Sequence, residues 1–194
     1  MAKTDRPKSE PGFSLCGYLL IATPALGDPN FYRSVILLIQ HDQQGAMGVI
    51  LNRPLNKTIG EAWLQVSGMA RTNSHPLHEG GPCPGPLLAL HKMKPHTDLE
   101  VTSAIYAAIS SESVTALVEG NAAPVKFIFG NAGWSPGQLE VEIREGSWLL
   151  LPARPETVFG SAEGLWLHLT REASRRAAAP FIPDHIVPTD PHMN

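Results

Sequence analysis

The chain has 194 residues, of which 43% are hydrophobic and 17% are charged, and its formal net charge is −3. This composition provides a hydrophobic core and excludes a disordered chain, while the length favours one domain with tails. No Lys or Arg run is longer than Arg175-Arg176. The chain therefore does not look like a protein whose main task is to hold nucleic acid, because such proteins present a basic stripe to the phosphates.

Cysteine usage and the N-terminal segment both favour the cytoplasm. Cys16 and Cys83 are the two cysteines and form no C-x-x-C pair, so we expect reduced thiols. Three basic residues precede the apolar stretch Leu15–Ala22, which loosely resembles a signal peptide, but Asp5 and Glu10 dilute that charge. No apolar stretch approaches the ~20 residues that cross a bilayer. We therefore predict a cytoplasmic protein without a membrane partner.

The first elements are predicted from local signals. Residues 1–13 are polar with two prolines and indicate a loose tail, and Leu15–Thr23 is typical of a strand. Asp28-Pro29 starts a single helical turn, because Asp accepts backbone N–H bonds and Pro fits the first helical position.

A β-hairpin is the best-defined element of the predicted fold. Ser34–His41 and Ala46–Asn52 are apolar and rich in β-branched residues, and a Gly-containing turn separates them. Val35–Ile39 is apolar on both faces of the strand, which predicts a central position in the sheet.

The rest of the chain alternates between short strands and helices. Thr58 and Glu61 form a capping box for a helix that runs to about Val66, and His75–Pro86 is dense in Gly and Pro and reads as a loop. Further strands are predicted at Leu87–His91, Leu99–Ala107, Val125–Phe129 and Trp148–Leu151, and further helices at Ser113–Glu119 and Leu165–Ala178.

Residues 133–137 (GWSPG) match the G-x-S-x-G motif of a hydrolase nucleophile elbow, with Asp184 and His185 downstream. The residue after the serine is Pro136, which has no N–H to offer an oxyanion. The sequence therefore favours a helix cap, in which Ser135 and Gln138 form a second capping box and the helix ends near Gly146.

Three segments resemble the AlgH/YqgE family of bacterial proteins: LLIATPALGDPNFYRSVILLIQHDQQGAMGVILNRP, HEGGP, and GNAGWSPGQLEVEIREGSWLLLPA. The resemblance implies an α+β fold, in which residues 14–179 form a single domain with a bifurcated, barrel-like mixed β-sheet flanked by helices. It also implies a cytosolic location and brings no enzymatic activity. The family's link to transcriptional regulation rests on genetic association. The N-terminal tail (1–13) and the Pro-rich C-terminal tail (180–194) depart from the family pattern.

Potential metal ligands gather in and after the predicted loop. They are His75, His78, Glu79, Cys83 and His91. A structural zinc site takes four ligands, commonly in paired short spacings, and only one such pair is present. We interpret these side chains as loop and turn residues and predict no metal and no cofactor.

The candidate site lies where the two strands of the hairpin end. Antiparallel pairing brings the start of the first strand beside the end of the second, so two arginines, a carboxylate and an amide meet there. They could hold an anion or an acidic tail of a partner, or Asp28 and Arg53 could form a structural ion pair. The ligand-binding candidates are Asp28, Arg33, Asn52, Arg53, His78, Gly80 and Gly81.

Two functions follow from this cluster, and neither has assigned catalytic residues. The first is a binding or regulatory protein that recognises another protein or a small anionic ligand, without direct nucleic-acid contact because no recognition helix is apparent. The alternative is an enzyme acting on a small anionic substrate, with Arg33 and Arg53 as the anion clamp and a carboxylate or His78 as acid and base.

Overall fold

The computed structural model describes residues 14–68, 72–120 and 123–178. The two predicted tails, 1–13 and 180–194, lie outside the described residues. The strands are β1 (Tyr18–Ala22), β2 (Val35–Asp42), β3 (Gly45–Ile50), β4 (Pro54–Thr58), β5 (Pro76–Glu79), β6 (Cys83–His91), β7 (Leu99–Thr102), β8 (Ile105–Ala108), β9 (Val125–Trp134) and β10 (Trp148–Pro152). The helices are η1 (Pro29–Phe31), α1 (Ile59–Ser67), α2 (Ser111–Gly120), α3 (Gln138–Arg144), α4 (Pro155–Phe159) and α5 (Leu165–Ala178).

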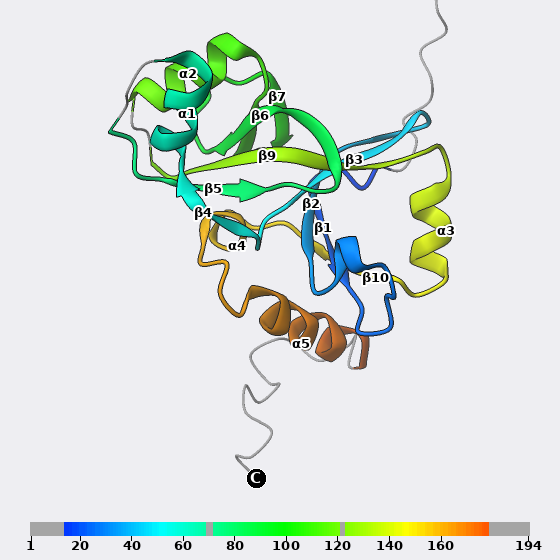
Figure 1. Ribbon diagram of the computed structural model, residues 1–194. Coiled ribbons are helices and arrows are strands. Elements are labelled where there is room, and N and C mark those ends of the chain that lie inside the picture. The colour runs from blue at the N-terminus through cyan, green and yellow to red at the C-terminus, as the bar shows by residue number, and fades with distance from the viewer. Residues whose placement is uncertain (1–13, 69–71, 121–122, 179–194) are drawn as a thin grey trace, which may run out of the picture.

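The strands form one forked, mostly antiparallel sheet in the order β10-β1-β2-β3-β9-β6-β8-β7. The first half of β9 pairs in parallel with β5, which also pairs with β4, while the second half pairs with β3. Both branches therefore leave the same side of β9 (Figure 1). The predicted single α+β domain with a mixed sheet is confirmed. The barrel-like description holds only loosely, because the sheet is not closed.

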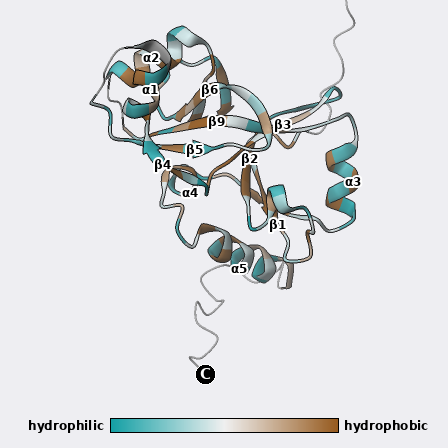
Figure 2. Cartoon of the chain, in the orientation of Figure 1, coloured by the Kyte–Doolittle hydropathy of each residue, from teal (hydrophilic) through white to brown (hydrophobic). Residues whose placement is uncertain are grey.

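Three groups of helices cover the sheet. Figure 1 shows α1 and α2 together at one end, α5 at the opposite end and α3 on a third side. Apolar residues concentrate on the central strands, whereas α3 is mostly hydrophilic (Figure 2). Each helix group packs over its own buried hydrophobic cluster. Helix α5 covers one face of β1 and β2, α3 covers the opposite face of these strands, and α1 and α2 cover β6 and β9.

The predicted hairpin is confirmed as β2 and β3. Asp42 pairs with Gly45, so the turn is tight. Residues 35–39 are buried and sort alternately between two core clusters, with Leu37 on one face and Ile36 and Leu38 on the other. Since β1 and β3 flank β2, the predicted central position is also correct.

Two stretches differ from the sequence-based predictions. The predicted loop His75–Pro86 contains β5 and the start of β6, and Leu99–Ala107 is a hairpin of two strands instead of one extended segment. Within this loop, β5 becomes a strand because β9, some fifty positions later, supplies a parallel partner: Leu77 pairs with Phe127. Local composition carries no sign of such a distant partner.

The two predicted capping boxes have different outcomes. At α1, Thr58 Oγ1 accepts a bond from the Glu61 N–H, and the Glu61 carboxylate accepts one from the Thr58 N–H, as predicted. At α3, the predicted Ser135 cap is wrong, because the helix starts at Gln138 after the left-handed Gly137 (φ 76°). Only the Gln138 side chain takes part, accepting from the Ser135 N–H at 3.0 Å.

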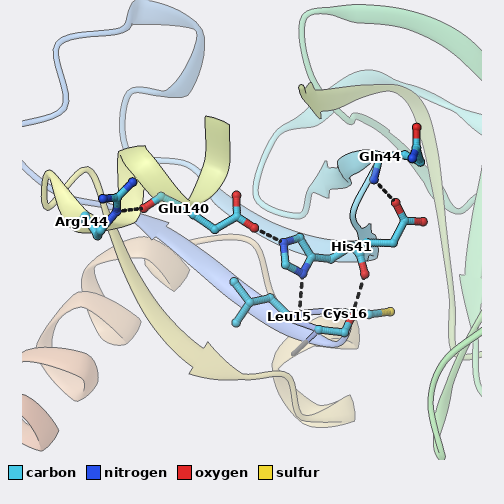
Figure 3. Close-up of polar contacts among 8 residues, drawn as sticks. Leu15, Cys16, His41, Gln44, Glu140 and Arg144 are labelled. Carbon is cyan, nitrogen blue, oxygen red and sulfur yellow. Dashed lines mark hydrogen bonds and ion pairs between the residues drawn. The ribbon is translucent and has the colours of Figure 1, made fainter. Parts of the chain in front are cut away.

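His41, at the end of β2, fastens the start of the described chain to α3 (Figure 3). Its Nδ1 accepts the Leu15 N–H at 2.9 Å, so the ring proton lies on Nε2 and is donated to the Glu140 carboxylate at 2.8 Å. The Ser14 hydroxyl also donates to the His41 carbonyl oxygen. His41 therefore has a structural role at the end of β2.

We predict that His41→Phe lowers the free energy of unfolding by about 1–3 kcal/mol, because it leaves the buried Leu15 N–H without its acceptor. Denaturant unfolding measures the change. His168→Phe, at an exposed position of α5, is the matched control and should change stability by less than about 0.5 kcal/mol. Equal stability of the His41 variant and the wild type would show that the ring does not fasten this segment.

For α3, we predict that Ser135→Ala changes the free energy of unfolding by less than about 0.5 kcal/mol, because the hydroxyl does not cap the helix. Gln138→Ala should cost about 1 kcal/mol, since it removes the acceptor of the Ser135 N–H. Thermal unfolding of both variants decides the matter, and a larger loss in the serine variant would restore the capping role.

Candidate functional site

Asn52 joins the two strand ends at which the sequence places the candidate site. Its Oδ1 accepts the Val35 N–H at 2.9 Å, and its Nδ2 donates to the Arg33 carbonyl oxygen at 2.9 Å. The start of β2 and the end of β3 are therefore adjacent, as antiparallel pairing requires. Both hydrogen-bonding atoms of the amide are used by the backbone, so Asn52 has a structural task.

Asp28 and Arg53 do not form the ion pair that was one of the two interpretations. Asp28 caps η1 by accepting the Asn30 N–H at 2.8 Å. Arg53 donates to the Asn30 carbonyl oxygen at 2.6 Å, and its Nη1 lies 3.8 Å from Glu79 Oε2. Arg53 thus ties the η1 turn to the end of β5.

Arg33 is the cation of this cluster that forms no ion pair within the described residues. Its guanidinium carbon lies 5.0 Å from the centroid of the Tyr32 ring and 5.1 Å from that of Trp166, on α5. Its backbone adopts a left-handed conformation (φ 51°), which is uncommon for a residue with a side chain. Each stacking contact between the guanidinium and an aromatic ring contributes about 0.5–1 kcal/mol at an exposed site.

Gly80 and Gly81 are required by close packing of the backbone. A Cβ on Gly80 would lie 2.2 Å from the Gly130 carbonyl oxygen, and one on Gly81 would lie 2.4 Å from that of Asn131. Gly80 also donates its N–H to Phe129 and accepts the Ile50 N–H. These glycines therefore let the two branches of the sheet separate at β9.

His78 faces a different environment from the arginines. Neighbouring residues of a strand point to opposite faces, so His78 points away from the face of Glu79, the partner of Arg53. It lines a pocket of about 500 Å³ between β5, the start of β9 and the segment that links α4 to α5. We call this the Lys126 pocket, and its lining residues are Pro54, His75, Pro76, His78, Pro124, Val125, Lys126, Phe159, Gly160, Ser161, Ala162 and Glu163.

Lys126 is the unusual residue of this pocket. It stands in β9 with only 5% of its surface exposed, and its Nζ donates to the Leu51 carbonyl oxygen at 3.1 Å. No carboxylate pairs with it within the described residues. Burial lowers the pKa of this ammonium group to about 8, because water no longer solvates the charge.

His78 shares the face of Lys126. The parallel register places His78 beside Ile128, which is two positions from Lys126 on the same face of β9. The imidazole is 4% exposed, and its buried Nδ1 has no hydrogen-bond partner in the part of the chain that the structure describes. Burial, and after it the charge of Lys126, lowers the pKa of His78 to about 4. The ring is therefore neutral at physiological pH.

The sequence analysis included His78 among the ligand-binding candidates but did not identify Lys126. The available signal was a single lysine inside the apolar strand segment VKFIF, because lysine is almost never fully buried unless it is paired. Alternation places Lys126 on the same face as Ile128, which lies in the core. Which residues surround the ammonium group depends on β5 and on the α4–α5 segment, and no local signal in the sequence places either of them beside Lys126.

The candidate metal ligands do not converge into a metal site among the described residues, and two members of the candidate triad lie outside those residues. No group of three or more His, Cys, Asp or Glu side chains within residues 14–68, 72–120 and 123–178 could hold a metal ion. Ser135 is exposed, and Asp184 and His185 lie outside the described residues. In the same ranges, no helix is long and apolar enough to cross a membrane.

A second hollow of about 320 Å³ lies between α1, α2 and the sheet, lined mainly by apolar side chains such as Leu77, Leu87 and Phe129. Ligand sites usually combine apolar walls with a few convergent polar groups and perturbed pKa values. The Lys126 pocket meets this description better, and we therefore take it as the candidate functional site.

For the cluster at the strand ends, we predict that Asn52→Ala lowers the free energy of unfolding by about 1–3 kcal/mol, because two backbone groups lose their partner. Arg33→Ala should cost about 1–2 kcal/mol, since the guanidinium makes two stacking contacts of about 0.5–1 kcal/mol each. Chemical denaturation compares the two. A larger loss in the Arg33 variant would indicate that stacking, and not the amide, holds this end of the sheet.

Comparison with known proteins identifies the relatives of this chain. The model of the AlgH-like family matches residues 19–178. A UPF0301 protein of Xanthomonas oryzae is 41% identical over 162 residues, covering 78% of this chain and 85% of the relative. A UPF0301 protein of Streptomyces coelicolor is 35% identical over 196 residues, covering 93% and 96%.

Two solved structures share the fold. The solution structure of the AlgH protein from Pseudomonas aeruginosa has a TM-score of 0.72 and 27% identity, and it covers 92% of this chain and 99% of that protein. A crystal structure of a Corynebacterium diphtheriae protein has a TM-score of 0.64, covering 80% and 85%, and at 22% identity it supports the fold alone. With the family model matching most of its length, the chain belongs to the AlgH-like family.

Proposed function

We propose that the protein is a cytoplasmic binding or regulatory protein that recognises a small anionic ligand in the Lys126 pocket. The observation that supports this most directly is the burial of the Lys126 ammonium group without an acidic partner in the described part of the chain. An isolated buried charge is costly, and a bound anion would supply the missing opposite charge.

The other polar groups of the pocket suit an anion of modest size. The neutral His78 ring is part of the lining, and Ser161 adds a hydroxyl at the exposed rim. Glu163 is the acidic side chain of the lining, and it too lies at the exposed rim. A carboxylate or a phosphate group is therefore the ligand chemistry that these residues favour.

The arginine cluster is a weaker candidate for the same task. Asp28, Asn52 and Arg53 are engaged with backbone groups or with Glu79, so an anion would compete with bonds that already exist. Arg33 remains available for a protein partner with an acidic surface. We keep that surface as the secondary binding candidate.

An enzyme acting on a small anionic substrate is the second candidate function. The specific observation in its favour is that a neutral imidazole and an amine of lowered pKa line one pocket. Groups with such shifted pKa values gather at active sites more often than elsewhere. Both functions require an anion site in the Lys126 pocket.

We predict that phosphate or acetate raises the melting temperature of the wild type and leaves that of Lys126→Met unchanged. At ten times the dissociation constant, binding contributes about 1.4 kcal/mol, which corresponds to about 3–6 °C for a domain of this size. Without anion, the Met variant should be at least as stable as the wild type at neutral pH, because it removes an uncompensated buried charge.

A thermal-shift series at constant ionic strength provides the measurement. Lys57→Met, at an exposed position of β4, is the matched control and should keep the full response to anions. Arg53→Ala should also keep it. Equal anion responses in all four proteins would contradict the proposal, and a loss confined to Arg53→Ala would move the site to the strand ends.

A further inference from the structure

The position of Lys126 suits a reactive amine as well as a positive charge that binds an anion. Its Nζ donates to the Leu51 carbonyl oxygen, and its other two N–H positions have no acceptor among the described residues. The residue stands on a strand that pairs on both sides, so the side chain starts from a rigid backbone. The rim of its pocket is exposed at Pro76, Ser161 and Glu163, which gives a small molecule access.

The environment of Lys126 favours the uncharged amine, which is the form that acts as a nucleophile. Burial lowers its pKa to about 8, so a substantial fraction is neutral near pH 7.5. An amine of ordinary lysine pKa would be more than about a hundredfold less deprotonated at that pH. The titratable groups that line the pocket with it are His75, His78 and Glu163.

We infer that Lys126 is a nucleophile that forms an imine with a small ligand carrying both a carbonyl and an acidic group, such as a 2-oxo acid. The inference rests on the proposed anion site and adds the chemical class of its ligand. The acidic group is attracted by the charged fraction of Lys126. The protonated imine then keeps one positive charge next to that group.

The step balances without an oxidant or a reductant. The lone pair of the neutral Nζ attacks the carbonyl carbon, a C–N bond forms, and the carbonyl oxygen takes up a proton as the nitrogen releases one. The carbinolamine hydroxyl then takes a second proton from solvent, its C–O bond breaks and water leaves, and the nitrogen lone pair forms the C=N bond of the protonated imine.

Reductive trapping of the full-length protein with glyoxylate and cyanoborohydride tests the inference. We expect one carboxymethyl group per chain, found on Lys126 by peptide mapping, at a rate about tenfold or more above that of exposed Lys57. The trapping rate at Lys126 should rise between pH 7 and pH 8.5, as more of the amine loses its proton. Modification of surface lysines with Lys126 unmodified would overturn the inference.

Lys126→Arg tests the imine, because arginine forms no imine under these conditions. We expect this variant to lose trapping, while Lys57→Arg retains both trapping at Lys126 and the melting-temperature response to phosphate. A wild type that responds to phosphate without trapping at Lys126 would overturn the imine alone, and absence of both would overturn both. If Lys126→Arg fails to fold, peptide mapping of the wild type still decides the matter.

Discussion

Strand β9 pairs with β3, β5 and β6 at once, and the arrangement of the whole domain depends on how it does so. Its first half lies between β5 and β6, and its second half pairs with β3. The two branches can separate only because Gly80 passes directly against the backbone of Gly130. The Gly80 carbonyl oxygen accepts the Ile50 N–H from the end of β3, so the backbone groups at the fork remain satisfied.

The same fork produces the buried lysine. Lys126 lies in the half of β9 that pairs with β5, and its side chain reaches the Leu51 carbonyl oxygen just beyond the end of β3. Strand β5, the start of β9 and the α4–α5 segment enclose a lysine at this position. The fold itself therefore keeps water away from the ammonium group, with or without a ligand. The shifted pKa is therefore a consequence of the sheet topology.

The strand-end cluster and the Lys126 pocket differ in how far their polar groups are already satisfied. Asp28, Asn52 and Arg53 accept from or donate to the backbone and hold the η1 turn against the sheet. In the pocket, His78 Nδ1 has no partner and Lys126 has no opposite charge among the described residues. A group that is buried and unsatisfied gains more from a ligand than one whose bonds are already made.

The sequence alone determined the family, the α+β class and every element whose signal is local. The Thr58–Glu61 capping box, the β2–β3 hairpin and α5 were all predictable, because the interactions that form them span only a few residues. The Ser135 cap failed because Gly137 interrupts the turn before the helix begins. Only the tertiary structure decided β5, the fork and the Lys126 pocket, since these join segments far apart in the chain and burial, unlike capping, is set by such distant neighbours.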